Sequence, residues 1–133
     1  MDFFPEMQIA ASGLNAERAR LEIIAGNIAN VNTTKTAGGD VFRRQLVQLV
    51  SAGSGEDGEL PGVNVAGVVS DPSPLHQVYD PANPEADDKG FVAKPNVDVM
   101  LEMVDMLGAT RSYQANVTAI QSAKEMIRHA LEI

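Results

Sequence analysis

Apolar residues recur at heptad spacing between residues 7 and 31. One row contains Met7, Leu14, Leu21 and Ile28, and a second contains Ala10, Ile24 and Val31. Glu17 interrupts the second row, and the other polar residues fall on the remaining faces. This pattern predicts an amphipathic helix with a narrow apolar stripe.

A second heptad pattern occupies residues 99–131. Its rows are Val99, Met106, Tyr113, Ile120 and Ile127 on one side and Met103, Val117 and Leu131 on the other, interrupted by Thr110 and Lys124. Asn96 or Asp98 can cap the start of this helix, because a short polar side chain accepts from the free amides of a first turn. Neither stripe can be buried by one helix alone. We therefore expect the two helices to pack as a coiled-coil-like pair, with apolar surface left for neighbours.

The middle of the chain has a different character, because glycines and prolines divide it into short segments. Residues 41–50 and 63–69 are the best strand candidates, and the acidic segment 53–62 would join them as a hairpin. Residues 71–94 read as irregular, with Tyr79, Phe91 and Val92 as anchors. The prediction is a mainly α protein with three parts: an N-terminal helical segment, a β-rich and irregular insert, and a C-terminal helical segment, over residues 1–34, 35–95 and 96–133.

Composition narrows the possible partners. The 133-residue chain has no Trp and carries a formal charge of −8. Residues 51–88 contain eight acidic residues and no Lys or Arg, which argues against nucleic acid as a partner. No apolar run is long enough to span a membrane, so we expect no direct membrane insertion. Residues 1–21 do not resemble a cleaved signal peptide, so we expect any export to retain the N-terminus.

The sequence offers little catalytic chemistry. There is no cysteine, and the only histidines, His76 and His129, lie 53 positions apart. Residues 51–55 are glycine-rich but lack the Lys-Ser/Thr ending of a phosphate-binding loop. Asp87 and Asp88 lie in a segment typical of an exposed turn, where no burial would separate their pKa values. We therefore expect no catalytic residue, no metal and no cofactor; an enzyme would require a pocket that places His76 beside a carboxylate of shifted pKa.

Two sets of motifs resemble a known family. Ala11-Ser12-Gly13-Leu14 and the run from Asn27 to Thr33 resemble the N-terminal motif of the flagellar rod and hook axial proteins. A more specific resemblance to the proximal-rod proteins of that family lies at residues 79–84, 89–92, 95–99, 102–104 and 111–116. The chain departs from the family at residues 33–36, where Thr-Thr-Lys-Thr replaces the common Thr-Pro-Gly-Tyr turn.

The resemblance implies a structural subunit of the proximal rod. Such a subunit would be exported by the flagellar type III apparatus and would assemble in the periplasmic space with other rod proteins and copies of itself. The resulting helical tube would transmit torque from motor to hook. Two alternatives remain at this point: another axial family member, or a soluble coiled-coil adaptor or secreted regulator.

We expect the subunit interface to draw on both helices. Paired asparagine amides at the end of the first helix can bond to free carbonyls or to a neighbouring subunit, and a tyrosine in the second helix can pack between helices. The predicted interface residues are Leu14, Leu21, Asn27, Ile28, Asn30, Met103, Met106, Tyr113, Gln114, Asn116, Val117, Ile120 and Ile127.

Overall fold

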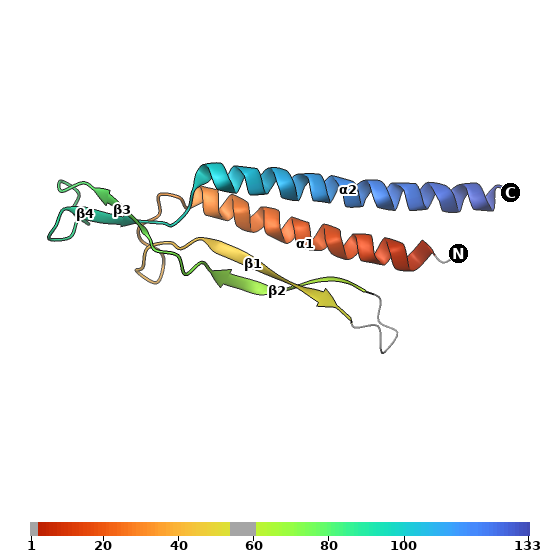
Figure 1. Ribbon diagram of the computed structural model, residues 1–133, viewed down its shortest axis with the longest axis horizontal. Coiled ribbons are helices and arrows are strands. Elements are labelled where there is room, and N and C mark those ends of the chain that lie inside the picture. Colours follow the sequence, from red (N-terminus) through yellow and green to blue (C-terminus); the bar gives the residue numbers. More distant parts are fainter. Residues whose placement is uncertain (1–2, 54–60) are drawn as a thin grey trace.

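The computed structural model describes residues 3–53 and 61–133. Two long helices dominate it: α1 (Phe3–Ala29) and α2 (Val99–Leu131). They run antiparallel, so the start of α1 and the end of α2 lie at the same end of an elongated molecule (Figure 1). The predicted helix pair with an insert between its members is therefore confirmed in outline.

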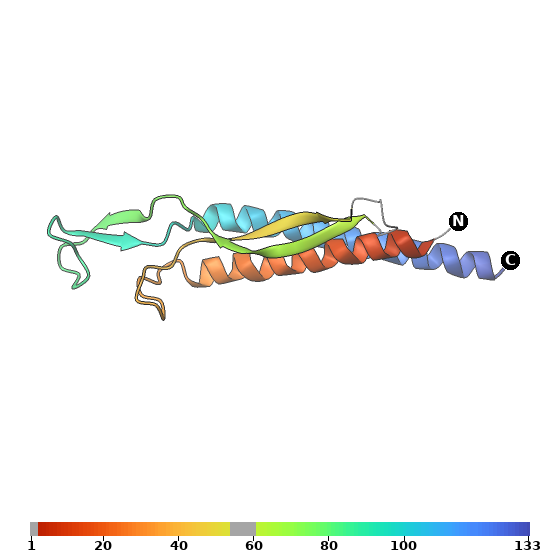
Figure 2. The same ribbon diagram turned by 90° about the horizontal axis from the view of Figure 1, so that it is seen from below.

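The first part of the insert is an antiparallel hairpin of β1 (Gln45–Ala52) and β2 (Gly62–Ser70). The register shifts between Gln48 and Leu49, where β2 contains an extra residue. The hairpin lies along α1, which is the middle layer between the hairpin and α2 (Figures 1 and 2). This confirms the predicted hairpin, whereas most of its predicted acidic turn lies outside the described residues.

Residues 71–94 are more regular than predicted. They contain a second antiparallel hairpin, β3 (His76–Tyr79) with β4 (Phe91–Lys94), at the end of the molecule opposite the termini (Figure 1). Tyr79 and Phe91 pair directly in its register, and their rings meet edge to face with centroids 5.4 Å apart. Strands of four residues flanked by prolines carry too few alternating positions to be recognised from the sequence.

Small side chains dominate the contact between α1 and α2. Ala10 and Ile24 of α1 are buried, as the heptad pattern indicates, and so are Ala109 and Ala123 of α2. A side chain added at Gly13 would place its Cβ 2.8 Å from the Asn116 amide nitrogen, so the helices approach closely there. The second predicted row of α2 is wrong as an intramolecular contact, because Met103 and Leu131 are exposed. Alanine, asparagine and glutamate occupy the row that faces α1.

Polar side chains cap both helices at the end of the pair that lies away from the chain termini (Figure 1). The Asp98 carboxylate accepts from the amides of Met100 and Leu101, so Asp98 is the N-cap of α2, as one of the two predicted candidates. Near the end of α1, Asn30 donates to the carbonyl of Gly26 at 2.8 Å and satisfies a helix-end acceptor. These contacts fix where α1 ends and where α2 begins.

Candidate assembly interface

A buried polar cluster joins α1, α2 and the first hairpin. Asn27, 1% exposed, donates to the carbonyl of Gln45 and accepts from its amide, each at 2.9 Å. The same amide group donates to Glu102 of α2 at 3.3 Å. Because Asn27 is one turn from the end of α1 and Gln45 begins β1, one side chain fixes the start of the hairpin against both helices.

Arg44 completes this cluster. Its guanidinium donates to Glu102, to Asp71 at 3.3 Å and to Asp105 at 3.2 Å. Glu102 is fully buried, and its two oxygens bond to Arg44 and Asn27 respectively. A buried carboxylate is tolerated only when it is paired in this way. Arg44 therefore links β1, the connection after β2, and the first turns of α2.

Hydrogen bonds and charges also hold the connection after β2 in place. Asn96 accepts from the amide of Arg44 at 2.8 Å and donates to the carbonyl of Ser73 at 3.0 Å. Hydrogen bonds from the Ser73 hydroxyl and amide lower the pKa of Asp71, and Arg44 adds to this effect. The bond to Glu102 raises the pKa of Arg44, so the guanidinium stays charged.

The face of α2 opposite α1 is apolar at its N-terminal end. Met100, Val104 and Leu107 are 76%, 62% and 62% exposed, and helical periodicity places them on the side away from buried Glu102 and Ala109. We call these three residues the outer stripe. Beyond it, the same face becomes polar, beginning with Arg111. A contiguous apolar stripe on an otherwise polar helix face is typical of a protein contact.

The first hairpin also leaves apolar surface uncovered. Its exposed apolar side chains are Leu49, Val50, Val65, Val68 and Val69. Residues 45–53 and 61–70 contain no charged residue. The hairpin and α2 are the two outer layers of the molecule (Figures 1 and 2), and each therefore carries exposed apolar side chains.

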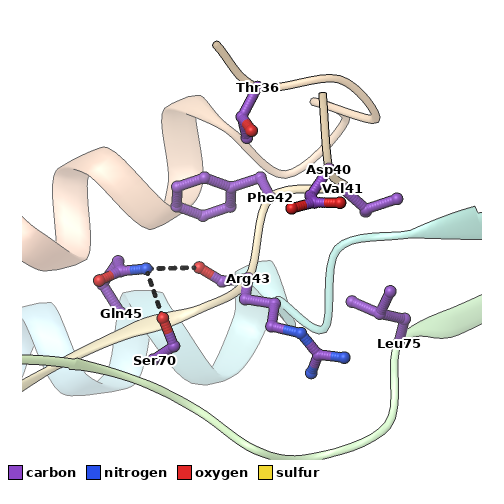
Figure 3. Close-up of a pocket in the computed structure, with 8 residues that line it drawn as sticks. All are labelled: Thr36, Asp40, Val41, Phe42, Arg43, Gln45, Ser70 and Leu75. Atoms are coloured by element: carbon purple, nitrogen blue, oxygen red, sulfur yellow. Dashed lines mark hydrogen bonds between the residues drawn. The ribbon is translucent and has the colours of Figure 1, made fainter. Parts of the chain in front are cut away.

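A recess of about 460 Å³ separates the turn at residues 36–42 from the connection at residues 70–75 (Figure 3). Gln45 lies at its edge and donates to the Arg43 carbonyl and the Ser70 hydroxyl, both at 3.2 Å. Its lining is mixed: Thr36, Asp40, Val41, Phe42, Arg43, Gln45, Ser70 and Leu75. No His and carboxylate pair lines it, so it gives no support to the enzymatic alternative.

The predicted interface residues divide into three environments. Asn27 is buried and bonds within the subunit. Met103 and Gln114 are exposed. The others are half-buried along the edges of the helix contact: Leu14, Leu21, Ile28, Asn30, Met106, Tyr113, Asn116, Val117, Ile120 and Ile127.

Sequence reasoning missed Glu102, Arg44 and the outer stripe. The signal for Glu102 was a charged residue in heptad spacing with Ala109 and Ala123. That spacing predicts a buried face of α2 only if alanine and glutamate are counted among the residues that can be buried. The outer stripe was missed because the heptad rows predicted for α2 contain none of Met100, Val104 and Leu107.

A membrane-spanning helix or a metal-binding cluster would point to another kind of function. Neither helix is apolar enough over sufficient length to cross a membrane, within the part of the chain that the structure describes. Over residues 3–53 and 61–133, no group of three or more His, Cys, Asp or Glu side chains is arranged to hold a metal ion.

Two segments of the chain match protein families. Residues 7–35, which include most of α1, match the family described as "Flagella basal body rod protein". Residues 88–133, which include all of α2, match "Flagellar basal body rod FlgEFG protein C-terminal". Both matches therefore lie on the helix pair and its immediate flanks.

Curated relatives match over nearly the whole length. The flagellar basal-body rod protein FlgC of Bacillus subtilis is 40% identical, with 100% of this chain and 99% of the relative covered. The FlgC protein of Borreliella burgdorferi is also 40% identical, covering 100% and 98%. That of Escherichia coli O157:H7 is 42% identical over 94% of this chain and 92% of the relative.

These matches decide between the alternatives that the sequence left open. Relatives named as rod proteins agree with a structural role rather than an enzymatic one, and they do not support a free adaptor or regulator. Since identity of about 40% extends over the full chain, this protein belongs to the FlgC family of flagellar basal-body rod proteins and is a structural subunit of the rod.

Proposed function

We propose that the subunit belongs to the proximal rod and transmits torque through contacts made by the outer stripe of α2. The exposure of Met100, Val104 and Leu107 carries this proposal. Burying one such side chain stabilises a contact by roughly 1.5–3 kcal/mol, so the three together offset a substantial part of the roughly 4–15 kcal/mol that association costs. The occupant we assign to the stripe is a neighbouring rod subunit.

Transmission of torque also requires a subunit that does not deform. The cluster of Asn27, Arg44 and Glu102 connects the hairpin to both helices through buried hydrogen bonds. The hairpin and helices would therefore move as one body when a neighbour applies shear. The half-buried predicted residues, such as Tyr113 and Ile120, are proposed to extend the contact along the edges of the helix pair.

We further propose export by the flagellar type III apparatus and assembly in the periplasmic space. The tube would contain other rod proteins and copies of this chain. Membership in a rod family supports assembly with rod components. The apolar stripe gives a reason why such a subunit would associate once exported.

Charge substitutions can test the stripe. Val104→Asp places a charge in its middle, and Ser122→Asp places the same charge on the polar half of the same helix face. In cells lacking the native gene, we expect Val104→Asp to abolish swimming and to leave rods short or absent in electron micrographs of basal bodies. Ser122→Asp should support both swimming and complete rods.

Both purified variants should unfold at nearly the wild-type temperature, because the two positions are exposed. Normal rods with Val104→Asp would show that the stripe is not a subunit contact. Loss of rods with both folded variants would also contradict the proposal, since the effect would not be specific to the stripe.

A further inference from the structure

The small residues in the contact between α1 and α2 do not by themselves fix how far one helix is displaced along the other. On α2, Ala109, Asn116 and Ala123 repeat at intervals of seven residues on the side that faces α1. On α1, Gly13 lies opposite Asn116. A slide of one heptad would bring Ala109 or Ala123 opposite Gly13. Either alanine is smaller than asparagine, so the contact at Gly13 would not oppose the slide. Asn116 would move opposite Glu6 or Arg20, whose long side chains can turn toward solvent.

The buried polar cluster does fix the register, because its hydrogen bonds can form at only one alignment of α2 on α1. Asn27 bonds to Glu102 across the helix contact, and Arg44 bonds to the other oxygen of Glu102. A slide in one direction would carry Glu102 past the end of α1 at Ala29. A slide in the other direction would set it near Arg20, a suitable charge, but would forfeit the bonds from Asn27 and Arg44.

Arg44 also ties this register to the rest of the chain. Its guanidinium reaches Asp71 and Asp105 as well as Glu102, and Gln45 beside it is held by both polar groups of Asn27. The hairpin is therefore placed by the same contacts that align the helices. A subunit with slipped helices would present the outer stripe and the hairpin at the wrong relative positions.

We propose that Glu102 is a positioning residue that sets the register of α2 on α1 through Asn27 and Arg44. A single buried polar contact is known to select register in helix pairs at some cost in stability. Removing one partner of a buried ion pair is costly when the other charge is left alone. Arg44 retains Asp71 and Asp105 as partners when Glu102 is replaced, so its charge stays paired. The proposal concerns the folded chain itself and does not depend on the function proposed for the outer stripe.

The absence of native cysteine allows a direct test of register by disulfide formation. The native pair combines Gly13→Cys with Asn116→Cys. The two slipped pairs combine Gly13→Cys with Ala109→Cys or with Ala123→Cys, and both carry Asn116→Ala to make room for the new side chain. Each pair is placed in the wild-type, Glu102→Gln and Glu102→Leu backgrounds of the full chain and oxidised under dilute conditions.

We expect wild type to form the native disulfide almost exclusively. Glu102→Gln should keep a smaller preference for it, since glutamine retains one of the two accepting oxygens and places an amide donor at the other. In Glu102→Leu, the ratio of native to slipped disulfide should fall by about tenfold or more, while helix content by circular dichroism stays near wild type.

Two outcomes would overturn the proposal. If Glu102→Leu keeps helix content and still forms only the native disulfide, other parts of the chain set the register. If Glu102→Leu and Glu102→Gln both lose helix content, Glu102 is required for stability rather than for register.

Discussion

A single amide side chain, that of Asn27, joins three segments of the chain. Its carbonyl and amide groups pair with the backbone of Gln45, and its amide also reaches Glu102. An asparagine near a helix end is easily interpreted as a capping residue, and Asn30 does bond to a helix-end carbonyl. Which of the two asparagines is buried could not be deduced from their spacing, because burial depends on where the hairpin returns.

Replacement of Asn27 should therefore be more costly than replacement of Asn30. Asn27→Ala leaves buried polar groups on Gln45 and Glu102 without a partner, so we expect the free energy of unfolding to fall by about 2 kcal/mol. Asn30→Ala, at a half-buried position, should lower it by about 1 kcal/mol or less. Chemical denaturation of both variants measures the difference, and equal losses would contradict the structure.

Asp71 should make part of the stability depend on pH. Its pKa is lower in the folded chain because Ser73 and Arg44 stabilise the ionised form. The ionised form therefore stabilises the fold above the unfolded value of about 3.9, and this contribution is lost as pH falls through the lower folded value. Between pH 6 and pH 3, the unfolding free energy of wild type should fall more steeply than that of Asp71→Asn. Parallel curves would show that Asp71 does not contribute.

At the scale of elements, the periodic segments could be predicted and the short ones could not. Both helices and the first hairpin follow from repeated apolar positions, whereas β3 and β4 have only four residues each. The face of α2 that packs against α1 was missed because its buried residues, Glu102, Ala109 and Ala123, have the composition of a solvent-facing row. The predicted rows instead included Met103 and Leu131, which are exposed.

The turn of the second hairpin depends on Gly90. Its φ is +84°, and an added Cβ would lie 2.9 Å from a ring carbon of Tyr79. Gly39 has a similar φ of +86° but open space around it. Gly39→Ala should lower the local opening free energy by about 1 kcal/mol and Gly90→Ala by roughly 2 kcal/mol or more. Hydrogen exchange of the amides in each turn measures both opening free energies. Equal losses in the two variants would show that the close contact with Tyr79 does not add to the cost at Gly90.

At the scale of the whole molecule, the chain is an elongated subunit with α1 between the first hairpin and α2 (Figures 1 and 2). Both outer layers carry exposed apolar side chains. The family could be predicted from the sequence, because the motifs around Asn27 and from residue 95 to 116 are specific. The outer stripe, which we propose as a subunit contact, could not be predicted, since it consists of apolar residues that neighbouring helices would cover equally well inside one chain. Only the arrangement of the elements separates inward from outward positions.

Electron microscopy of basal bodies from cells that lack this gene tests the central claim most directly, with swimming measured alongside. A structural rod subunit predicts absent or truncated rods and loss of motility, both restored by the intact gene. Complete rods and hooks in the deletion strain would contradict a structural role for this chain in the rod.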